Sequence, residues 1–588
     1  MNLLEQTIAA VSPPSTALTD DVRKVFAAHR PLNFGRLENA LLRYISITGQ
    51  RHPAPPQTSV IISCADHGVA AESVSAYPPE TTLNMMCNYL IAHGGAANAV
   101  ANYAEARLIV ADLGVNADTQ EIPGLIHRSI MRGTANMTKG PAMTREQAIQ
   151  ALETGIALAD ARAKSGDSCI LPGEMGISNT TSSAAIAAAL LRLTPEEVTG
   201  RGANISDARL THKIEIVRRA LAVNAPDPND GLDVLAKVGG FELGCIAGLI
   251  LGAAARQMLV ILDGANTTSA ALIAHSLAPT CTHFMLASHA SLTEHSQPHA
   301  LRRMGLTPVL RLDIRLSEAA GSSIALRMLN QMISVWNTLD GAASDLQPFA
   351  IPTEGTACTH EAASAPPLKR EAMDACQYRL DNLAKPIHSL GYLERIVVQL
   401  AGTMNCEQPP LDTKSALLLI TEEEQLPADL SRILAAITKE AGTPVHILPI
   451  SCDTAAYEAA HALARTYPLL ILGTHEKKEN TAISAALTSV LKGAAAGGSL
   501  ILPGDTITDR AAQNASEEDS SLSSHILHLL PDMLTVDAEL PAGIAGILGM
   551  NIVRSALHVI NDMKTFTETG VAVAIDGAGA GRQVRERT

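Results

Sequence analysis

Aromatic residues are scarce in this chain. Phe, Trp and Tyr make up 3% of its 588 residues, with a single Trp, whereas hydrophobic residues as a whole make up 47%. A core with so few large rings has to be packed from small and aliphatic side chains. The composition therefore favours a helix-rich α/β protein in which Ala and Gly allow close packing.

Basic residues are fewer than acidic residues. Lys and Arg number 44 against 59 Asp and Glu, which gives a net charge of −15 at pH 7. A protein that binds nucleic acid needs a basic face to neutralise phosphates, and no arginine-rich helix or RNA-binding aromatic pattern offsets the balance. The composition thus excludes nucleic acid as the main partner.

Three further features are missing. None of the nine cysteines forms a CxxC pair, and an odd number of scattered cysteines predicts reduced thiols in a cytoplasmic protein. The longest membrane-like run, 243–255, stops at Arg256, too short to span a bilayer, and the N-terminal segment lacks the basic region of a signal peptide. No HExxH motif, Cys/His cluster or close carboxylate array is present, so we expect no metal site, no cofactor and no membrane partner.

The first 345 residues contain a regular alternation of short β-branched runs with Ala- and Leu-rich helical runs. This pattern predicts an α/β fold with a mainly parallel, doubly wound sheet covered by helices on both faces, accompanied by a smaller helical subdomain. The expected strands are 58–66, 106–114, 167–174, 258–264 and 283–289, and the expected helices lie near 82–104, 145–164, 180–193, 207–222, 242–256 and 267–277.

Each expected strand ends in a polar or glycine-bearing turn. Ligands bind at the carboxyl ends of the strands in such sheets, so five turns on one edge predict a small-molecule site there. The turns are Asp66-His67-Gly68, Asp112-Leu113-Gly114, Gly173-Glu174, Asp263-Gly264 and Ser288-His289.

The chain repeats part of itself. Residues 30–50 are echoed by 385–405, and residues 169–190 by 470–491. A stretch rich in Pro, Ala, Ser and Thr separates the copies and predicts a linker. We therefore expect a first domain at 1–345, a linker at 346–365, a second and degenerate domain at 366–571, and a flexible tail at 572–588.

The second copy is shorter and has lost polar residues. Alignment of the copies pairs Glu174 with His475 and Glu318 with Ala542, whereas Asp263 meets Pro503 or Gly504. The counterparts of Lys213 and of Gly239-Gly240 fall in a gap: 73 positions separate Asn179 from Gly252, but 13 separate Asn480 from Gly493. The repeat therefore predicts one active site per chain.

Seven segments of the first copy carry the most specific pattern. They are ADHGVAAESVSAYPPETT (65–82), GEMGISNTT (173–181), GRGANISDARLTHKIEIVRRAL (200–221), VGGFELGCIAGLILGAAA (238–255), LDGANTTSAAL (262–272), ASHASLTEH (287–295) and RLSEAAGSSIAL (315–326). In this order they resemble the nicotinate-nucleotide:dimethylbenzimidazole phosphoribosyltransferase family, which makes the lower-ligand nucleotide of cobalamin. The second copy resembles the same family weakly, most clearly in KPIHSLGYLE (385–394) and INDMKTFTETGV (560–571).

The resemblance implies transfer of phosphoribosyl from nicotinate mononucleotide to a base nitrogen, with inversion at the anomeric carbon. Nicotinate leaves without an acid, but the ring N–H of the acceptor must lose a proton to a general base. By resemblance this base is Glu318, although Ala319 stands where the family has Gly, and Glu174 is a second essential carboxylate that holds the ribose hydroxyls or stabilises positive charge on the sugar. Taken alone, each carboxylate could simply be favoured by the dipole of a nearby helix N-terminus.

The other expected site residues divide between two subsites. Some also fit a structural role: Ser178, Asn179 and Thr180 could cap a helix, Lys213 could be a solvated helix lysine, and a lone His289 would more often be structural. The phosphoribosyl subsite is expected at Gly173, Gly176, Ser178, Asn179, Thr180, Gly202, Lys213, Gly239, Gly240, Asp263, Ser288, His289 and Ser291, and the base subsite at Ser75, Tyr77, Asn84, Met85 and Leu316.

Two questions stay open at this point. Asn84 stands where the family usually carries Gln, so the acceptor could be benzimidazole, adenine or a phenolic ring instead of dimethylbenzimidazole. A non-catalytic nucleotide-binding or regulatory protein is a further alternative, against which the retention of Glu174 and Glu318 argues. The family acts as a homodimer, so we expect either a homodimer or an intramolecular pseudo-dimer in which the second copy replaces the partner.

Overall fold

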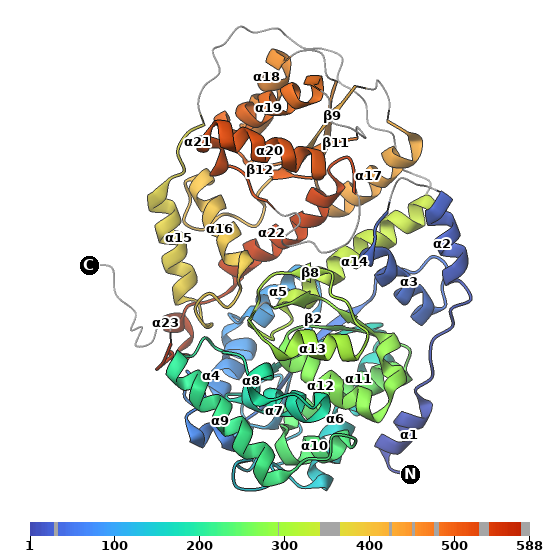
Figure 1. The fold of residues 1–588 in the computed structure, drawn as a ribbon, viewed down its shortest axis with the longest axis vertical. Helices are drawn as coiled ribbons and strands as arrows, with labels where there is room; N and C mark the ends of the chain where they lie inside the picture. Colours follow the sequence, from blue (N-terminus) through green and yellow to red (C-terminus); the bar gives the residue numbers. More distant parts are fainter. Residues whose placement is uncertain are drawn as a thin grey trace.

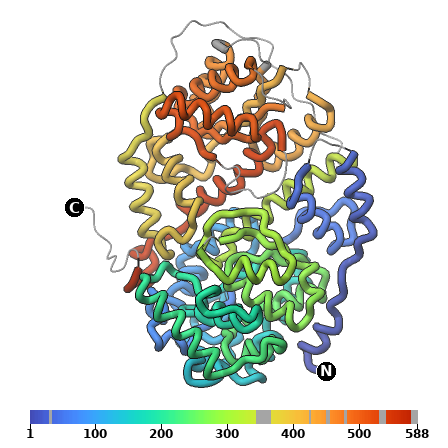
Figure 2. The backbone as a smooth tube through the Cα atoms, viewed as in Figure 1, coloured from blue at the N-terminus to red at the C-terminus, as the bar shows by residue number. Residues whose placement is uncertain are grey.

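The computed structural model describes residues 1–28, 33–291, 293–341, 365–422, 426–449, 453–475, 481–528 and 540–577. Two lobes are visible, one for each copy of the repeat (Figures 1 and 2). Nearly all of the expected linker, 346–365, lies outside the described residues.

The first lobe is built on a six-stranded parallel sheet. Its strand order is β3-β2-β1-β4-β5-β6, so the chain winds outward in both directions from β1, as the alternation predicted. β1 is buried along its whole length, and its pairing with β4 places Ser63 beside Glu174. The strands are β1 (Thr58–Ala65), β2 (Arg107–Gly114), β3 (Ile126–His127), β4 (Cys169–Met175), β5 (Leu259–Leu262) and β6 (Met285–Ala287). A separate pair is formed by β7 (His289–Ala290) and β8 (Leu310–Arg311).

Helices cover both faces of this sheet. They are α1 (Leu3–Ala10), α2 (Thr19–Ala28), α3 (Arg36–Thr48), α4 (Thr81–Cys87), α5 (Ala96–Ala104), α6 (Arg145–Lys164), α7 (Asn179–Leu191), α8 (Pro195–Val198), α9 (Asp207–Asn224), α10 (Gly231–Val238), α11 (Phe241–Ala255), α12 (Ala265–Leu277), α13 (Ser296–Arg303) and α14 (Ala320–Leu339). The apolar run near 243–255 forms the buried helix α11, as expected. α11 packs on α6 so closely that Gly155 and Gly248 have no room for a side chain, which explains how a core with few rings is filled.

The helical pattern expected near 82–104 is interrupted. α4 passes into a π-helical turn (Asn88–Ala92), and Gly94-Gly95 then separate this turn from α5. A π-helical turn of this kind is often found at a functional site.

The second lobe repeats the centre of the first. Its strands are β9 (Ser415–Thr421), β10 (Val445–Pro449), β11 (Leu469–Thr474) and β12 (Leu500–Pro503), and their order β10-β9-β11-β12 reproduces β2-β1-β4-β5. Helix starts repeat as well: Gly35 before α3 has φ 52° and ψ −119°, and Gly391 before α16 (Tyr392–Met404) has φ 54° and ψ −120°. The tandem repeat is therefore present in the backbone geometry.

The second lobe is shortened where the alignment predicted it. One helix, α19 (Thr481–Ala496), connects β11 to β12, in place of α7 to α11 between β4 and β5. After β12, Thr508 Oγ1 accepts the N–H of Gly504, just as Thr267 Oγ1 accepts the N–H of Asp263, both at 3.1 Å. Gly504, not Pro503, is thus the counterpart of Asp263.

The lobes join through equivalent helices. α14 packs against α17 (Ala428–Ala441) of the second lobe, α22 (Ile544–Asp562) packs against α5 of the first, and α14 and α22 touch each other. Among the described residues, α22 is the one helix long and apolar enough to cross a membrane, but most of it is buried inside the fold, as in a core helix. The remaining helices of the second lobe are α15 (Arg370–Asn382), α18 (Asp453–Ala464), α20 (Thr506–Glu518), α21 (Ser520–Ser523) and α23 (Phe566–Thr569).

Residues 572–577 belong to the segment expected as a flexible tail, yet they are bonded to the first lobe. The N–H of Ile575 donates to the carbonyl of Ala76 at 2.7 Å, and Asp576 pairs with Arg209 at 2.9 Å. An extended segment held by such contacts has no hydrophobic periodicity, so no local pattern indicated it. The rest of the expected tail, 578–588, lies outside the described residues.

Candidate active site

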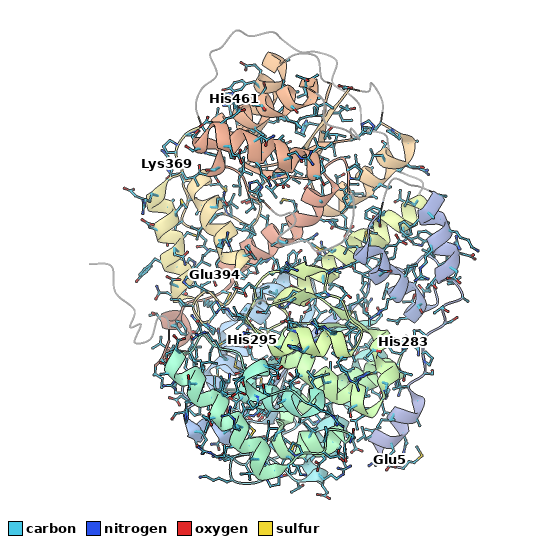
Figure 3. All side chains as sticks on the ribbon, in the orientation of Figure 1. Glu5, His283, His295, Lys369, Glu394 and His461 are labelled. Atoms are coloured by element: carbon cyan, nitrogen blue, oxygen red, sulfur yellow. The ribbon has the colours of Figure 1, made fainter. Side chains whose placement is uncertain are left out.

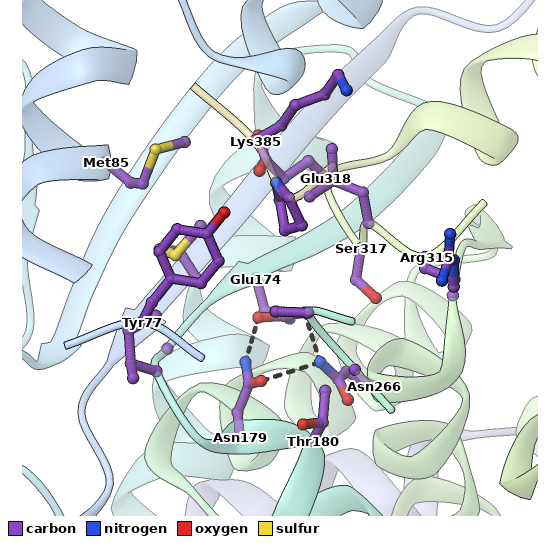
Figure 4. Close-up of a pocket in the computed structure, with 18 of the residues that line it drawn as sticks. Tyr77, Met85, Glu174, Asn179, Thr180, Asn266, Arg315, Ser317, Glu318 and Lys385 are labelled. Atoms are coloured by element: carbon purple, nitrogen blue, oxygen red, sulfur yellow. Dashed lines mark hydrogen bonds between the residues drawn. The ribbon is translucent and has the colours of Figure 1, made fainter. Parts of the chain in front are cut away.

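A pocket opens at the carboxyl edge of the six-stranded sheet, where the ends of β4 and β5 meet the start of α14 (Figure 4). The polar strand-end turns were expected to gather at this edge. The expected substrate-binding residues that line the pocket are Tyr77, Met85, Glu174, Gly176, Asn179, Thr180, Gly202, Leu316 and Glu318.

Glu174 lies in a buried hydrogen-bonded cluster. The side-chain amides of Asn179 and Asn266 both donate to its carboxylate, and Asn266 Nδ2 lies 2.7 Å from Oε1 (Figure 4). Burial raises the pKa of Glu174 to about 8; the charges of Glu242 and Glu318 add to the rise, and the two amides oppose it. Glu174 therefore exchanges a proton near neutral pH, and a cationic ligand would favour its charged form.

Glu318 lies in the same pocket, just before α14. Its Oε2 accepts a hydrogen bond of 3.1 Å from the backbone N–H of Ala97, in the first turn of α5. Burial raises the pKa of Glu318 to about 7; the Ala97 N–H and the Tyr89 hydroxyl act to lower it, and the charge of Asp263 acts to raise it. A carboxylate that titrates near neutrality is suited to accept a proton as a general base.

Tyr89 is a neighbour of Glu318 that the sequence did not single out. It is fully buried in the π-helical turn, and its ring fills the space that Gly95 leaves by having no side chain. Its hydroxyl interacts with Glu318 without reaching full hydrogen-bond geometry, and it has no other partner among the described residues. The expected base is thus a polar neighbour of a buried hydroxyl that makes no hydrogen bond within the described residues.

Asp263 shapes the turn that carries Glu318 and does not line the pocket. Its carboxylate accepts the backbone N–H groups of Ala319, Gly321 and Ser322 at 3.0, 2.8 and 3.0 Å. These bonds satisfy the free N–H groups at the start of α14. Asp263 thus sets the position of the turn from which Glu318 reaches the pocket.

Lys213 lies behind the pocket, in contact with Thr180 of its lining. Its Nζ donates to Thr180 Oγ1 at 2.8 Å and to the carbonyl of Gly200 at 3.2 Å, while Glu294 Oε1 accepts the N–H of Gly202 at 3.0 Å. Burial lowers the pKa of Lys213 to about 8, and the nearby charge of Glu294 opposes this. The solvated-lysine alternative does not describe this residue, because its side chain is buried.

Several residues expected to bind phosphoribosyl do not line the pocket. Gly239 and Gly240 precede α11, beside a buried pair in which His67 Nε2 and Glu242 Oε1 are 2.7 Å apart. Ser178 occupies the N-cap position of α7, but its buried hydroxyl has no partner within the described chain, so it is available to a ligand. Gly173, Ser288, His289 and Ser291 are also buried outside the lining.

Two residues expected at the base subsite are turned elsewhere. Asn84 Oδ1 accepts the backbone N–H of Ala572 at 3.3 Å, and Ser75 Oγ accepts that of Tyr77 at 3.1 Å. Neither lines the pocket. Asn84, which is shorter than the Gln usual in the family, therefore bonds to the second lobe and does not line the pocket.

The second lobe completes the pocket wall. The residues that it contributes are Ala384, Lys385, Pro386, Phe566 and Val571. With Tyr77, Met85 and Leu316 of the first lobe, they give this side of the pocket a largely apolar surface.

A buried ion pair fixes the second-lobe part of the wall. Lys385 and Arg315 lie at the pocket (Figure 4), and Glu394 lies near the junction of the two lobes (Figure 3). Lys385 Nζ is 2.7 Å from Glu394 Oε1, and the carbonyl of His388 accepts a 2.8 Å bond from Arg315. Burial acts to raise the pKa of Glu394, but Lys385 and His388 hold it down to about 2. Glu394, His388 and Asp381 form the one cluster of possible metal ligands found in the described part of the chain, and Lys385 already neutralises its buried carboxylate.

Sequence reasoning missed Asn266, Glu294 and the second-lobe wall. Asn266 and Glu294 fall within the segments that carry the family resemblance, but a polar residue after a strand or in a loop is common and does not stand out. The segment 385–394, which contains Lys385, resembles the same family. This resemblance was the one signal in the sequence for the second-lobe part of the pocket wall.

Comparisons with known proteins identify the family to which the chain is similar. The family model described as Phosphoribosyltransferase matches residues 12–344 and 365–441. Relatives named nicotinate-nucleotide–dimethylbenzimidazole phosphoribosyltransferase include one from Geotalea uraniireducens, 43% identical over 338 residues (57% of this chain, 95% of the relative), and one from Chloroflexus aggregans, 44% identical over 331 residues (56% and 93%). The crystal structure of CobT from Thermus thermophilus matches with a TM-score of 0.52 and 38% identity, covering 54% of this chain and 96% of that chain. This chain therefore belongs to the nicotinate-nucleotide–dimethylbenzimidazole phosphoribosyltransferase family.

Proposed function

We infer that this chain transfers phosphoribosyl from nicotinate mononucleotide to dimethylbenzimidazole, giving α-ribazole phosphate and nicotinate for the nucleotide loop of cobalamin. The observation that carries the inference is the placement of two buried carboxylates, Glu174 and Glu318, in one pocket with an apolar wall. Free thiols at every cysteine among the described residues support a cytoplasmic location.

Each carboxylate has a distinct task in the proposed reaction. A nitrogen of the acceptor attacks the anomeric carbon while the bond to nicotinate breaks, and the electron pair of that bond leaves on the pyridine nitrogen. Glu318 takes the proton from the other ring nitrogen of the acceptor. Glu174, held by Asn179 and Asn266, stabilises the positive charge that develops on the sugar.

The phosphate of the substrate fits the N-terminal end of α7. The unpaired hydroxyl of Ser178 and the buried ammonium group of Lys213 lie at this end of the helix. Helix N-termini favour anions because their backbone N–H groups are free and carry partial positive charge. These groups supply the donors that an otherwise acidic protein needs for a phosphate.

The wall of the pocket favours dimethylbenzimidazole over the other acceptors. Met85, Leu316, Phe566 and Val571 surround the base side with apolar atoms. Methyl groups gain free energy from such burial, whereas the exocyclic amine of adenine would lose its hydrogen bonds to water.

Incubation with nicotinate mononucleotide and a panel of acceptors tests the function. We expect release of nicotinate and formation of α-ribazole phosphate, with the highest kcat/KM for dimethylbenzimidazole, and a loss of more than about a hundredfold in Glu318→Ala. Preference for benzimidazole, adenine or a phenol would establish the alternative acceptor. Binding of nicotinate mononucleotide without turnover would instead establish the non-catalytic alternative.

We also propose that the second lobe acts as an intramolecular partner for the first. The contacts α14 with α17 and α22 with α5 are equivalent under exchange of the two copies, as in the interface of a two-fold dimer. In addition, the second lobe supplies part of the wall of the pocket in the first. The chain is then a pseudo-dimer with one active site.

A further inference from the structure

Residues 571–577, called the strap below, run from the second lobe onto the first lobe, beginning at the pocket. Val571 lines the pocket, and the following residues bond to two separate parts of the first lobe. Neither the tandem repeat nor the catalytic residues account for these contacts.

The first attachment is to the base side of the pocket. The N–H of Ala572 donates to Asn84 Oδ1 on α4 at 3.3 Å, and the N–H of Ile575 donates to the carbonyl of Ala76 at 2.7 Å. Ala76 directly precedes Tyr77, whose side chain lines the pocket.

The second attachment is to the phosphoribosyl side. Asp576 Oδ2 lies 2.9 Å from Arg209 Nε and accepts both the N–H and the hydroxyl of Ser206 at 3.1 Å. Ser206 caps α9, the helix that carries Lys213, and it follows the loop that contains Gly202. The Asp576 and Arg209 side chains are 19% and 22% exposed, so water weakens this pair only in part.

Arg209 connects the base side of the pocket to the phosphoribosyl side. Besides pairing with Asp576, it donates to the carbonyls of Ser73 at 3.1 Å and of Ser75. The loop that leads to Tyr77, the start of α9 and the strap therefore meet at one guanidinium group. Partial burial acts to raise the pKa of Asp576, but the bonds from Ser206 and the charge of Arg209 hold it below its usual range, so the group is ionised at neutral pH.

We propose that Asp576 is a positioning residue for the transfer: through Arg209 and Ser206 it holds the Tyr77 loop and the start of α9 at the separation that the two substrates require. The proposal rests on the function inferred above and adds that the acceptor subsite is set by a segment of the second lobe. Loss of the strap would let the two sides move apart, and the acceptor base would lose its packed wall.

The test compares Asp576→Ala with a matched control, Asp160→Ala. Asp160 pairs with Arg256 at 2.6 Å on α6, away from the pocket. We expect Asp576→Ala to raise the KM for dimethylbenzimidazole about tenfold, the size of one charge-assisted hydrogen bond, with kcat changed less than about twofold. Asp160→Ala should leave both constants unchanged, and Asp576→Glu should restore part of the loss.

Arg209→Ala and the double variant test the route of the effect. If Asp576 acts through Arg209, the double variant should show about the same KM as the worse single variant, because the two changes break one connection. Truncation after Gly577 should behave as wild type, and truncation after Val571 should behave as Asp576→Ala.

Calorimetric binding of dimethylbenzimidazole gives a readout that does not need turnover. We expect a Kd about tenfold weaker in Asp576→Ala. If wild-type protein binds but does not release nicotinate, the proposed function fails while the strap is still tested. If Asp576→Ala and the truncation after Val571 lower only the Tm, with KM and Kd within about twofold of wild type, Asp576 is a merely structural residue and the proposal is overturned.

Discussion

Two glutamates in one pocket are given different surroundings. Glu174 accepts hydrogen bonds from two side-chain amides, whereas Glu318 accepts one from a backbone N–H and lies near the hydroxyl of Tyr89. Burial raises the pKa of both, to about 8 and about 7. The pH dependence of turnover and of stability should therefore report on each of them separately.

Tyr89→Phe should shift the acid limb of the pH profile to higher pH. Glu318 must be deprotonated to accept a proton, so activity rises as pH passes its pKa, and the Tyr89 hydroxyl keeps that pKa down. Its removal should move the limb in kcat/KM upward by roughly half a unit to one unit. Tyr103→Phe is the control, because this buried hydroxyl bonds to Asn551 between the lobes. Identical profiles for Tyr89→Phe and wild type would show that the hydroxyl does not act on Glu318.

Glu174→Gln should stabilise the unliganded protein, and more so at higher pH. The pKa of Glu174 is raised from its ordinary 4.5 to about 8, so in this range the folded state keeps a proton that the unfolded chain has released. Wild-type stability then falls as pH rises through that window, and the variant should be free of this loss. The variant's advantage in the free energy of unfolding should grow by about 1–3 kcal/mol between pH 5 and pH 8, measured by urea denaturation. An equal advantage at both pH values, or the same result for the exposed control Glu121→Gln, would contradict this origin.

At the scale of elements, the sequence predicted what is periodic and local. The strands near 58–66 and 106–114 and the helix near 145–164 form as expected, because burial patterns identify them without distant contacts. The break of the 82–104 pattern was not predicted, although Gly94-Gly95 is a signal in the sequence that marks it, because glycine disfavours a helix interior. The contact of Asn266 with Glu174 joins residues 92 positions apart, which no local pattern records.

The starts of α14 and α22, which are equivalent helices, are each bonded to a buried aspartate, although Asp505 also caps α20 and is not the sequence counterpart of Asp263. Asp263 caps α14 of the first lobe, and Asp505 Oδ2 accepts the N–H of Gly543 at the start of α22 at 3.3 Å and that of Thr474 at 2.8 Å. Asn offers one accepting oxygen in place of two, so Asp263→Asn and Asp505→Asn should each lose about 1–3 kcal/mol of stability. Only Asp263→Asn should also reduce nicotinate release, because the turn before α14 carries Glu318, the proposed base, whereas Ala542 stands at the equivalent place before α22. An equal loss of turnover in Asp505→Asn would contradict this division.

At the scale of the whole molecule, the contacts between the lobes bear on the oligomeric state. In the proposed pseudo-dimer, α22 and α17 take the place of a two-fold partner against α5 and α14. We therefore expect a monomer of 61.6 kDa in solution, measured by light scattering over a range of protein concentrations. Twice this mass at all concentrations would show that the first lobe still pairs with a second chain.

Because Lys385 and Phe566 of the second lobe line the pocket, the structure predicts the outcome of a complementation test between two defective chains. When two subunits share an active site, a chain with a defective carboxylate and a chain with a defective wall can restore activity by pairing. Here the wall and the carboxylates are carried by one polypeptide. A Glu318→Ala chain mixed with a Phe566→Ala chain should therefore show no complementation, because neither polypeptide can supply the part of the pocket that the other lacks.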